Sequence, residues 1–429
     1  MSANHGVEAG GVANVGTITI TRGTFRDNSA TSRGAAIWNL GDATLDMVTF
    51  VSNQASGLDS AVLHNGGGVL RATRCTITAS FDTTAVFNLA GAAQLRECTI
   101  ADNGGGVVND GMLSLIDCTL RDNADIFAKR PGLYNRGTAT ILSTTISGHA
   151  ARKGAGLMNE GTITLINSTI SGNRADGSGG GVFNLGTLRL GNVTIANNVA
   201  NRDRASSEDG GGIFNSVSGS VELSNTILAG NTDLEGRAHD CSGIVTSHGH
   251  NLIQDSRGCI RLGVATGDHL GHDAYLGSLQ DNGGKTWTHA LMDDSPALDN
   301  GDASTDGSAL GSCAPTDQRG VPRPHGLRCD IGAYELTLHC GNGQIDTPEE
   351  CDDGNAAPRD CCSRTCQFER ATLAGDANCD GRATSADLTQ IVRLLGDGTR
   401  SPCHLDDANG DCRLDARDLS AAVDALQAP

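Results

Sequence analysis

One unit of about 24 residues recurs nine times between residue 7 and about residue 232. Each unit has an asparagine that follows a mostly apolar residue, and another apolar residue lies 11 or 12 positions further on. The asparagines are Asn14, Asn39, Asn65, Asn88, Asn109, Asn135, Asn159, Asn184 and Asn215, and the later apolar residues are Phe25, Phe50, Ile77, Ile100, Leu120, Ile146, Ile170, Ile195 and Ile227. Such a chain can bury its apolar residues only by stacking equivalent units.

Within a unit, apolar residues such as Ile163 and Leu165 alternate with threonine, and glycine and asparagine separate the runs. Alternation with period two indicates short strands. Three strands per unit fit one coil of a right-handed parallel β-helix, in which each strand pairs with its equivalent in the next coil. We expect an all-β rod of about nine coils, roughly 40 Å long, with the asparagines stacked as a ladder at the strand spacing of about 4.8 Å.

Charge and hydropathy exclude several partners. The net charge of −19 would repel a phosphate backbone, so we expect no nucleic-acid partner. No run approaches the roughly 18 apolar residues of a membrane span. Because the first residues also lack a basic segment followed by an apolar one, no signal peptide is visible, and we expect the chain to be incomplete at its N-terminus.

The 15 cysteines are unevenly distributed. Cys75, Cys98 and Cys118 lie in the repeats, each two residues before a core position, and we interpret them as buried small side chains rather than as disulfides. The other twelve follow residue 240 in acidic, glycine-rich sequence, which is typical of disulfides in an oxidising compartment. The expected location is extracellular or at the cell surface.

The repeat, with its Gly-Gly-Gly-Val-Phe-Asn and Thr-Ile-x-Asn-Asn segments, resembles bacterial β-helix repeats of the pectin-lyase-like superfamily. A second region resembles the choice-of-anchor Q region that closes many such helices, through residues 251–253, 276–286, 289–291, 295–299, 317–320 and 330–335.

Residues 340–366 contain five clustered cysteines and are similar to the myxobacterial cysteine-rich disulfide repeat, with Cys361 as an extra cysteine. A zinc site is the alternative interpretation of this cluster. The family resemblances imply disulfides between Cys241 and Cys259, between Cys313 and Cys329, and between Cys379 and Cys403.

Residues 372–429 resemble a type I dockerin, with two calcium loops that each precede an amphipathic helix. The expected apolar faces contain Leu388, Ile391, Val392 and Leu395 in the first helix, and Leu419, Val423 and Leu426 in the second. The resemblance implies Ca²⁺ ligands at Asp376, Asn378, Asp380, Arg382, Thr384 and Asp387, and at Asp407, Asn409, Asp411, Arg413, Asp415 and Asp418.

The two loops differ from each other. Cys412 stands in the second loop where glycine normally allows the sharp turn. The positions that contact cohesin in this family are Ser385 and Ala386 in one loop and Ala416 and Arg417 in the other, so they do not match. A cohesin-like or cell-surface partner is the interaction that this module implies.

Stacked acids are the candidate catalytic groups. Asp102 and Asp122 occupy equivalent turns of adjacent coils, as do Glu97 and Asp117, and Arg121 lies beside them. Adjacent coils would place each pair roughly 5 Å apart at the backbone, close enough for coupled carboxylates or a bound cation. Solvated rim charges are the simpler interpretation. Polar surface groups are likewise the simpler interpretation of His239, His248, His250, His269 and His272, whose spacing fits no common zinc pattern.

We therefore expect four parts: β-helix repeats in 1–235, a cap in 236–337, a cysteine-rich module in 338–370 and a calcium-binding module in 371–429. Two functions remain open. The first is a non-catalytic display, adhesion or carbohydrate-associated protein tethered by its C-terminal modules. The second is a polysaccharide lyase or glycoside hydrolase that a dockerin recruits to a scaffold.

Overall fold

The computed structural model describes residues 1–337, apart from 58, 125–129, 201–209, 238, 265, 293, 305–311 and 327. In the C-terminal part it describes residues 366, 377, 384–397 and 415–427. The chain divides into two units, Met1–Leu336 and Thr337–Pro429. The expected disulfide-rich module apart from Cys366, the expected Cys379–Cys403 disulfide and most of the calcium ligands lie outside the described residues.

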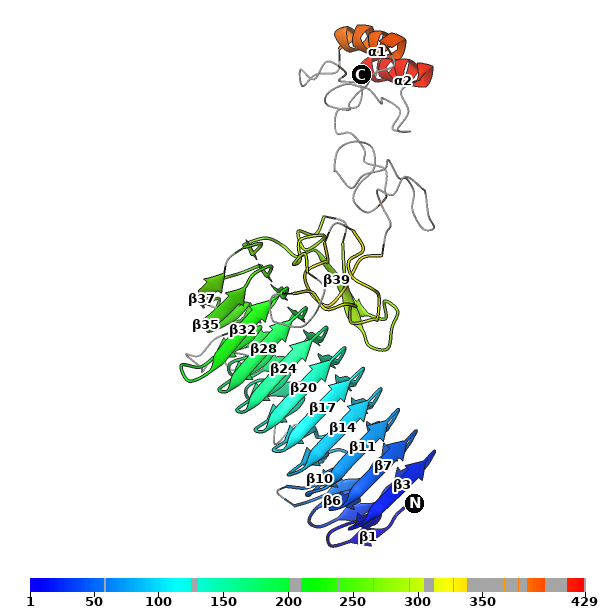
Figure 1. The fold of residues 1–429 in the computed structure, drawn as a ribbon, viewed down its shortest axis with the longest axis vertical. Helices are drawn as coiled ribbons and strands as arrows, with labels where there is room; N and C mark the ends of the chain where they lie inside the picture. The colour runs from blue at the N-terminus through cyan, green and yellow to red at the C-terminus, as the bar shows by residue number, and fades with distance from the viewer. Residues whose placement is uncertain are drawn as a thin grey trace. The chain divides into compact units, whose positions relative to one another are not determined.

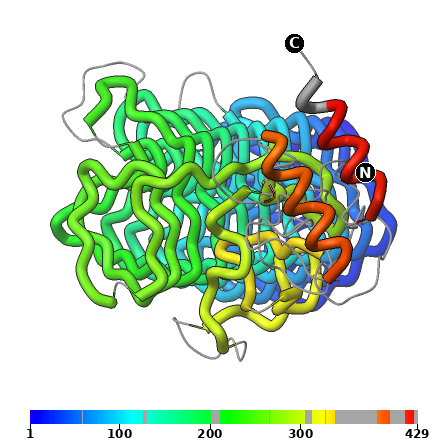
Figure 2. Tube along the Cα trace, turned by 90° about the horizontal axis from the view of Figure 1, so that it is seen from above, coloured from blue at the N-terminus to red at the C-terminus, as the bar shows by residue number. Residues whose placement is uncertain are grey.

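The first unit is a parallel β-helix whose coils follow one another as stacked turns (Figures 1 and 2). Its strands form three long rows, here called sheets I, II and III. Sheet I contains β2 Val12–Asn14, β6 Gly34–Asn39, β10 Ala61–Asn65, β13 Thr84–Asn88, β16 Gly105–Asn109, β19 Leu133–Asn135, β23 Leu157–Asn159, β27 Val182–Asn184 and β31 Ile213–Asn215. Sheet II contains β3 Thr17–Thr21, β7 Asp42–Asp46, β11 Val69–Thr73, β14 Ala92–Arg96, β17 Met112–Ile116, β20 Thr138–Leu142, β24 Thr162–Ile166, β28 Thr187–Gly191, β32 Ser220–Ser224 and β37 Cys259–Val264. The long strand β35, Cys241–His248, pairs with strands of both sheets.

Sheet III contains β4 Thr24–Arg26, β8 Thr49–Val51, β12 Thr76–Thr78, β15 Thr99–Ala101, β18 Thr119–Arg121, β21 Thr145–Ser147, β25 Thr169–Ser171, β29 Thr194–Ala196, β33 Ile227–Ala229, β36 Leu252–Ile253 and β38 His269–Leu270. Two-residue strands form two shorter parallel rows: β1 His5–Gly6, β5 Ser29–Ala30 and β9 Gln54–Ala55, and then β22 Ala150–Ala151, β26 Arg174–Ala175, β30 Val199–Ala200 and β34 Thr232–Asp233. The expected parallel β-helix of about nine coils is confirmed in the described residues.

The asparagine ladder is also present. Asn88 Nδ2 donates to Asn109 Oδ1 at 2.7 Å, and Asn109 Nδ2 donates to Asn135 Oδ1 at 2.7 Å. The same bond recurs from Asn14 through Asn215. Because these amides are buried, each rung satisfies groups that would otherwise be costly to bury.

A second buried ladder, which the sequence analysis missed, follows the strands of sheet III. Asn103 Nδ2 donates to Asn123 Oδ1 at 2.9 Å, and the backbone N–H of Asn123 donates to Nδ1 of His149 at 3.1 Å. The rungs are Asn28, Asn53, Ser80, Asn103, Asn123, His149, Asn173, Asn198 and Asn231, followed by Asp240. Burial raises the pKa of Asp240 to about 7.

The three early cysteines are buried and free, as expected. They also belong to a row of hydrogen-bonding side chains, a role that was not expected when the cysteines were interpreted as small buried side chains. The backbone N–H of Cys75 donates to Sγ of Cys98 at 3.4 Å, and that of Cys118 donates to Oγ1 of Thr144 at 3.3 Å. The thiols therefore act like the hydroxyl groups that hold equivalent positions in later coils.

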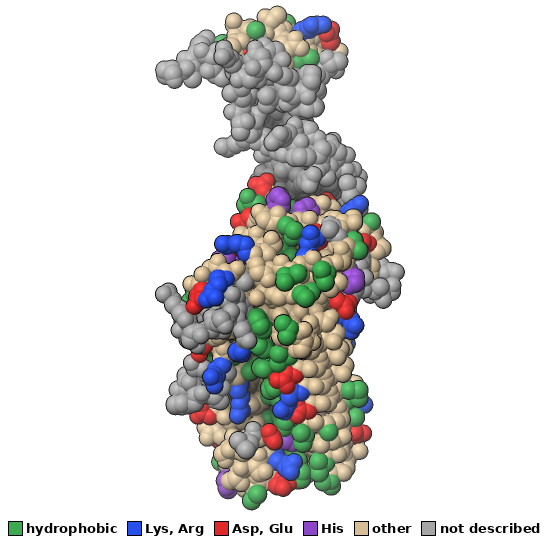
Figure 3. Space-filling model, turned by 90° about the vertical axis from the view of Figure 1, so that its left-hand side faces the viewer, with side chains coloured by type: hydrophobic (Ala, Val, Ile, Leu, Met, Phe, Trp, Pro, Cys, Tyr) green, Lys and Arg blue, Asp and Glu red, His purple; other side chains and the backbone are tan. Residues whose placement is uncertain are grey.

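The residue before each ladder asparagine in sheet I points outward and is mostly aromatic or apolar. The row contains Ala13, Trp38, His64, Phe87, Val108, Tyr134, Met158, Phe183 and Phe214. Figure 3 faces the side on which β6 and β10 lie in Figure 1, and hydrophobic side chains gather along it. The rings of Phe183 and Phe214 stack 4.8 Å apart, so this row adds packing outside the helix.

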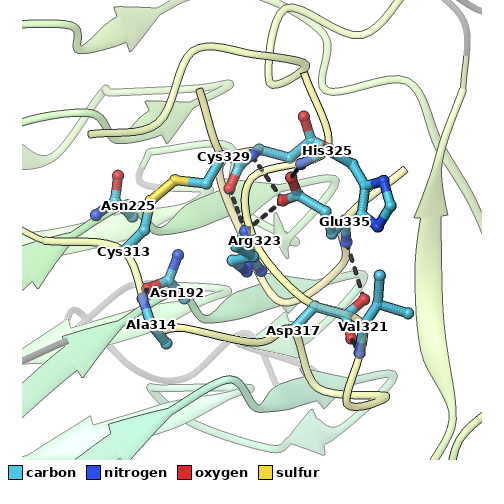
Figure 4. A network of polar contacts seen from close by, with 12 residues as sticks. Asn192, Asn225, Cys313, Ala314, Asp317, Val321, Arg323, His325, Cys329 and Glu335 are labelled. Carbon is cyan, nitrogen blue, oxygen red and sulfur yellow. Dashed lines mark hydrogen bonds and ion pairs between the residues drawn. A yellow bond between two sulfur atoms is a disulfide. The ribbon is translucent and has the colours of Figure 1, made fainter. Parts of the chain in front are cut away.

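After β38 the chain folds back over sheet III as a cap that includes the antiparallel strands β39 Leu276–Gln280 and β40 Thr288–Leu291. The Cys241–Cys259 and Cys313–Cys329 disulfides are present as expected. A buried network holds the end of the cap (Figure 4). Glu335 pairs with Arg323 at 2.9 Å and accepts backbone N–H groups of His325 and Asp330.

In the part of the second unit that the structure describes there are two helices, α1 Ser385–Asp397 and α2 Ala416–Gln427, as expected. Ile391 and Leu394 of α1 are buried with Ala422 of α2. Val392, expected on the apolar face, is 54% exposed, because Ile391 and Leu394 lie three residues apart on the face that contacts α2. No described helix is long and apolar enough to cross a bilayer.

Candidate functional site

Eight threonines form a row on the outer face of sheet III. Each precedes an inward core residue, so strand alternation turns the threonine outward. The parallel register places each one beside its equivalent in the next coil. The row contains Thr24, Thr49, Thr76, Thr99, Thr119, Thr145, Thr169 and Thr194. A threonine precedes the later apolar residue in all nine units of the sequence. In the ninth unit, however, the register aligns Ile227 with Thr194 and Leu228 with Ile195, so Ile227, which was expected to face the core, takes the outward position.

The cap covers one end of the row. Thr145 Oγ1 donates to the Trp287 carbonyl at 2.6 Å, and Thr169 Oγ1 donates to Gln318 Oε1 at 2.7 Å. Thr194 Oγ1 accepts the backbone N–H of Ala333 at 3.1 Å. These three threonines are buried, whereas Thr24, Thr49, Thr76, Thr99 and Thr119 are exposed or half-buried. The row is therefore divided into a covered part and an open part.

Two adjoining pockets lie where the open part meets the cap. One has a volume of about 190 Å³ and is lined by Thr99, Thr119, Arg121, Thr145, Ser147 and Trp287. The other has a volume of about 240 Å³ and is lined by Arg74, Glu97, Cys98, Thr99, Asp117, Thr119 and Lys285. Because both contain Thr99 and Thr119, they form one groove. Trp287 borders it with an indole that is half exposed.

The structure brings Glu97 and Asp117 together at one side of the groove. Lys285, from the cap, contacts Glu97 Oε1 at 2.7 Å and Asp117 Oδ2 at 3.3 Å. The hydrogen bond from Lys285 lowers the pKa of Glu97, and the same bond raises the pKa of Lys285. Glu97 is consequently held as a carboxylate, not as a proton donor.

Asp102 and Asp122 lie at the other side of sheet III, with Arg121 between them. Arg121 Nη1 is 3.0 Å from Asp122 Oδ2, and Nη2 is 4.0 Å from Asp102 Oδ2. Both aspartates have positive φ, 57° and 52°. Because aspartate tolerates the left-handed conformation better than most residues, the turn itself favours an acid at these positions.

This arrangement suits binding more than proton transfer. Each of the four acids has a cation within 4.0 Å, and the groove floor supplies neutral hydroxyl groups. A row of hydroxyls beside an exposed indole can hydrogen-bond a polar ligand and contact its C–H face. Among the described residues, no group of three or more His, Cys, Asp or Glu side chains is placed to hold a metal ion.

The five late histidines do not converge on one centre. His248 pairs with Glu222 at 3.3 Å, His239 lies 4.0 Å from Asp255, and His250 lies 3.7 Å from Asp302. The rings of His269 and His272 contact each other at 6.1 Å. They occupy separate polar contacts near the end of the β-helix.

Four of the twelve expected calcium ligands lie in the described residues. Thr384 and Asp387 begin α1, where the backbone N–H of Thr384 donates to Asp387 Oδ2 at 2.7 Å. Asp415 and Asp418 repeat this contact at α2, also at 2.7 Å. Such capping contacts fix the start of each helix. Both Asp387 and Asp418 are buried, as the last ligand of a calcium loop would be. The other eight expected ligands lie outside the described residues: Asp376, Asn378, Asp380, Arg382, Asp407, Asn409, Asp411 and Arg413.

The fold defines the class of the first unit as a parallel β-solenoid of about nine turns, with two disulfides in its described residues. Comparison of the chain with protein-family models, with curated proteins and with solved structures finds no match.

Proposed function

We propose that the protein is a non-catalytic carbohydrate-binding β-helix at the cell surface or outside the cell, tethered by a calcium-binding C-terminal module. The observation that carries the proposal is the groove in which the Thr99 and Thr119 hydroxyls lie open between charged side chains and the indole of Trp287. Sugars present hydroxyl groups around apolar C–H faces. The groove offers a partner to each.

Charge pairing favours binding over catalysis. Glycoside hydrolysis needs one carboxyl that is protonated at working pH and a second that is ionised. The ion pair with Lys285 works against the first requirement at Glu97 by lowering its pKa. A lyase or hydrolase is the second candidate, because Glu97, Asp117 and Lys285 border the same groove.

The finer assignments belong to the same proposal. The resemblance to the pectin-lyase-like superfamily and to the choice-of-anchor Q region supports an extracellular rod. The resemblance to a cysteine-rich repeat and a dockerin supports a C-terminal tether for a cohesin-like or cell-surface partner. The capped, buried Asp387 and Asp418 support Ca²⁺ binding at the starts of the two helices.

Binding to an array of neutral and acidic glycans tests the proposal. We expect the wild-type chain to retain at least one glycan class, and Thr119→Val to weaken binding because it keeps the side-chain volume but removes the hydroxyl. Thr140→Val is the matched control, because Thr140 is exposed on sheet II and lies in neither pocket. Equal loss in both variants, or no binding by the folded wild type, would contradict the proposal.

The enzymatic alternative is tested in parallel. Polygalacturonate and the bound glycans are incubated with the protein while unsaturated products and reducing ends are measured. We expect neither to increase. Product formation that Glu97→Gln or Asp117→Asn abolishes would establish the second candidate instead.

A further inference from the structure

We propose that the groove recognises the end of a glycan chain lying along the rod, and that Trp287 contacts the terminal sugar. This inference rests on the carbohydrate-binding function proposed above and adds the mode of binding. It follows from the way in which the cap closes the threonine row at one end only.

The closed end is a fixed wall. Thr145, at the edge of the first pocket, and Thr169 and Thr194 beyond it are buried, and their hydroxyls are bonded to the cap. A glycan that follows the row therefore cannot continue past Thr145. It must end there or leave the surface.

Hydrogen bonds connect the closed end of the cap to the β-helix at several points. The buried Gln318 donates through Nε2 to Thr145 Oγ1 at 2.9 Å and to Thr286 Oγ1 at 2.9 Å. Thr286 Oγ1 in turn donates to the Ser143 carbonyl at 3.0 Å. Gln318 Nε2 and Thr145 Oγ1 also donate to the Trp287 carbonyl, at 3.1 Å and 2.6 Å. These bonds fix the backbone that carries the indole of Trp287 at the closed end.

The row stays open in the other direction. From Thr119 the accessible hydroxyls continue through Thr99, Thr76 and Thr49 to Thr24, one for each coil. Coils repeat at about 4.8 Å, the spacing of paired strands. This repeat is comparable to the advance of one hexose in an extended 1,4-linked chain. Successive sugars can therefore meet successive coils.

Chain ends provide the direct test. The probes are cellohexaose and hexagalacturonate. Each is prepared in four forms: uncapped, with a bulky group at the reducing end only, with a bulky group at the non-reducing end only, and with bulky groups at both ends. We expect one of the hexasaccharides to bind, one of its singly capped forms to bind equally well, and the doubly capped form to bind at least tenfold more weakly. We expect Trp287→Ala to bind the uncapped probe more weakly than the wild type. Trp287→Phe, the conservative variant, should bind it more tightly than Trp287→Ala but less tightly than the wild type.

Length dependence tests the direction of the chain. We expect Thr49→Val to weaken binding of the hexasaccharide but not of the matching disaccharide, because a disaccharide at the wall reaches only Thr119 and Thr99. Thr119→Val should weaken both.

The outcomes separate the two proposals. Equal binding of uncapped and doubly capped hexasaccharide would overturn recognition of a chain end while leaving carbohydrate binding intact. If neither hexasaccharide binds and an extended peptide does, the threonine row is a peptide-binding site that a protein ligand occupies in the way the cap covers its closed end. Both proposals then fail.

Discussion

At the scale of single residues, the β-helix accommodates buried polar side chains because each has a hydrogen-bonding place in a repeating network. His149 shows this most clearly. It replaces asparagine in the second ladder, where Nδ1 accepts the backbone N–H of Asn123 and the His149 backbone N–H donates to Asn173 Oδ1 at 3.0 Å. Nε2 donates to the Leu120 carbonyl at 3.1 Å, and Nδ1 can accept the Asn123 N–H only in the neutral imidazole. In the protonated form Nδ1 would instead donate to the Asn123 carbonyl, which is also 3.1 Å away, and the ladder bond would be lost.

The stability of the first unit should therefore depend on pH through His149. Burial lowers the pKa of this imidazole in the folded protein, whereas the unfolded chain titrates near 6.5. The unfolded state thus binds the extra proton first, and stability falls as pH drops below about 6.5, by at most about 1.4 kcal/mol per pH unit. We expect His149→Asn to reduce this loss. Denaturant unfolding at pH 7.5 and 5.5 measures it.

The control is His5→Asn, because His5 is exposed on β1. It should keep the wild-type loss of stability between the two pH values. An identical loss in His149→Asn and His5→Asn would mean that protonation of His149 does not oppose folding.

The buried pair in the cap gives a second prediction. Arg323 and Glu335 have fully buried side chains, so Glu335→Ala leaves a guanidinium without its carboxylate. We expect a loss of about 3–5 kcal/mol in the free energy of unfolding. Arg323→Met combined with Glu335→Leu should lose less than Glu335→Ala alone, because the guanidinium is removed together with its carboxylate. Calorimetry of the three variants tests this, and a larger loss in the double variant would contradict it.

At the scale of the element, the coil is the unit of stability. Each coil contributes one rung to each ladder and one strand to each sheet, so a defect should be felt mainly by the coils on either side of it. Asn109→Ala removes a rung with ladder bonds in both directions and leaves Asn88 Nδ2 without its main acceptor. Asn14 lies at the first rung and is bonded only to Asn39 along the ladder.

We expect Asn109→Ala to lower the free energy of unfolding by about 2–4 kcal/mol, because buried amide groups lose their partners. Asn14→Ala, the matched variant, should cost about half as much. Hydrogen exchange should show the loss of protection concentrated in the coils around β13, β16 and β19. Uniform loss along the whole rod would show that the coils do not act as separable units.

Sequence patterns predicted the coil because its determinants are local. The alternation of Ile163, Leu165 and Ile170 specifies which side chains face inward, and stacking then sets the register. The second ladder was missed because Ser80 and His149 interrupt its run of asparagines. Lys285 and Trp287 were missed for a different reason. Their place in the groove depends on how the cap folds back, and no local pattern encodes that.

At the scale of the whole molecule, a different function is proposed for each of the two units. The β-helix and cap build the groove, and the second unit contains the expected calcium sites. Asp387 has two proposed tasks there, since it caps α1 and is expected to bind Ca²⁺. One substitution can distinguish them.

Asp387→Asn keeps an oxygen that can accept the Thr384 backbone N–H but removes the charge. We expect the helix content of the full chain in chelator to stay unchanged, and the Ca²⁺ affinity of the first site to fall about tenfold or more. Calorimetric titration and circular dichroism provide the two readouts, with Asp397→Asn as an exposed control in the same helix. Unchanged Ca²⁺ affinity in Asp387→Asn would limit this residue to capping.

The most direct test of the central proposal is a fluorescence titration with glycans. The chain has two tryptophans, and Trp38 lies on sheet I, away from the groove that Trp287 borders. We predict that a bound glycan changes the emission of Trp287, that the change is absent from Trp287→Phe and retained in Trp38→Phe, and that no new sugar ends form. No change with any glycan, or a change that survives in Trp287→Phe, would contradict the assignment of the groove as the carbohydrate-binding site.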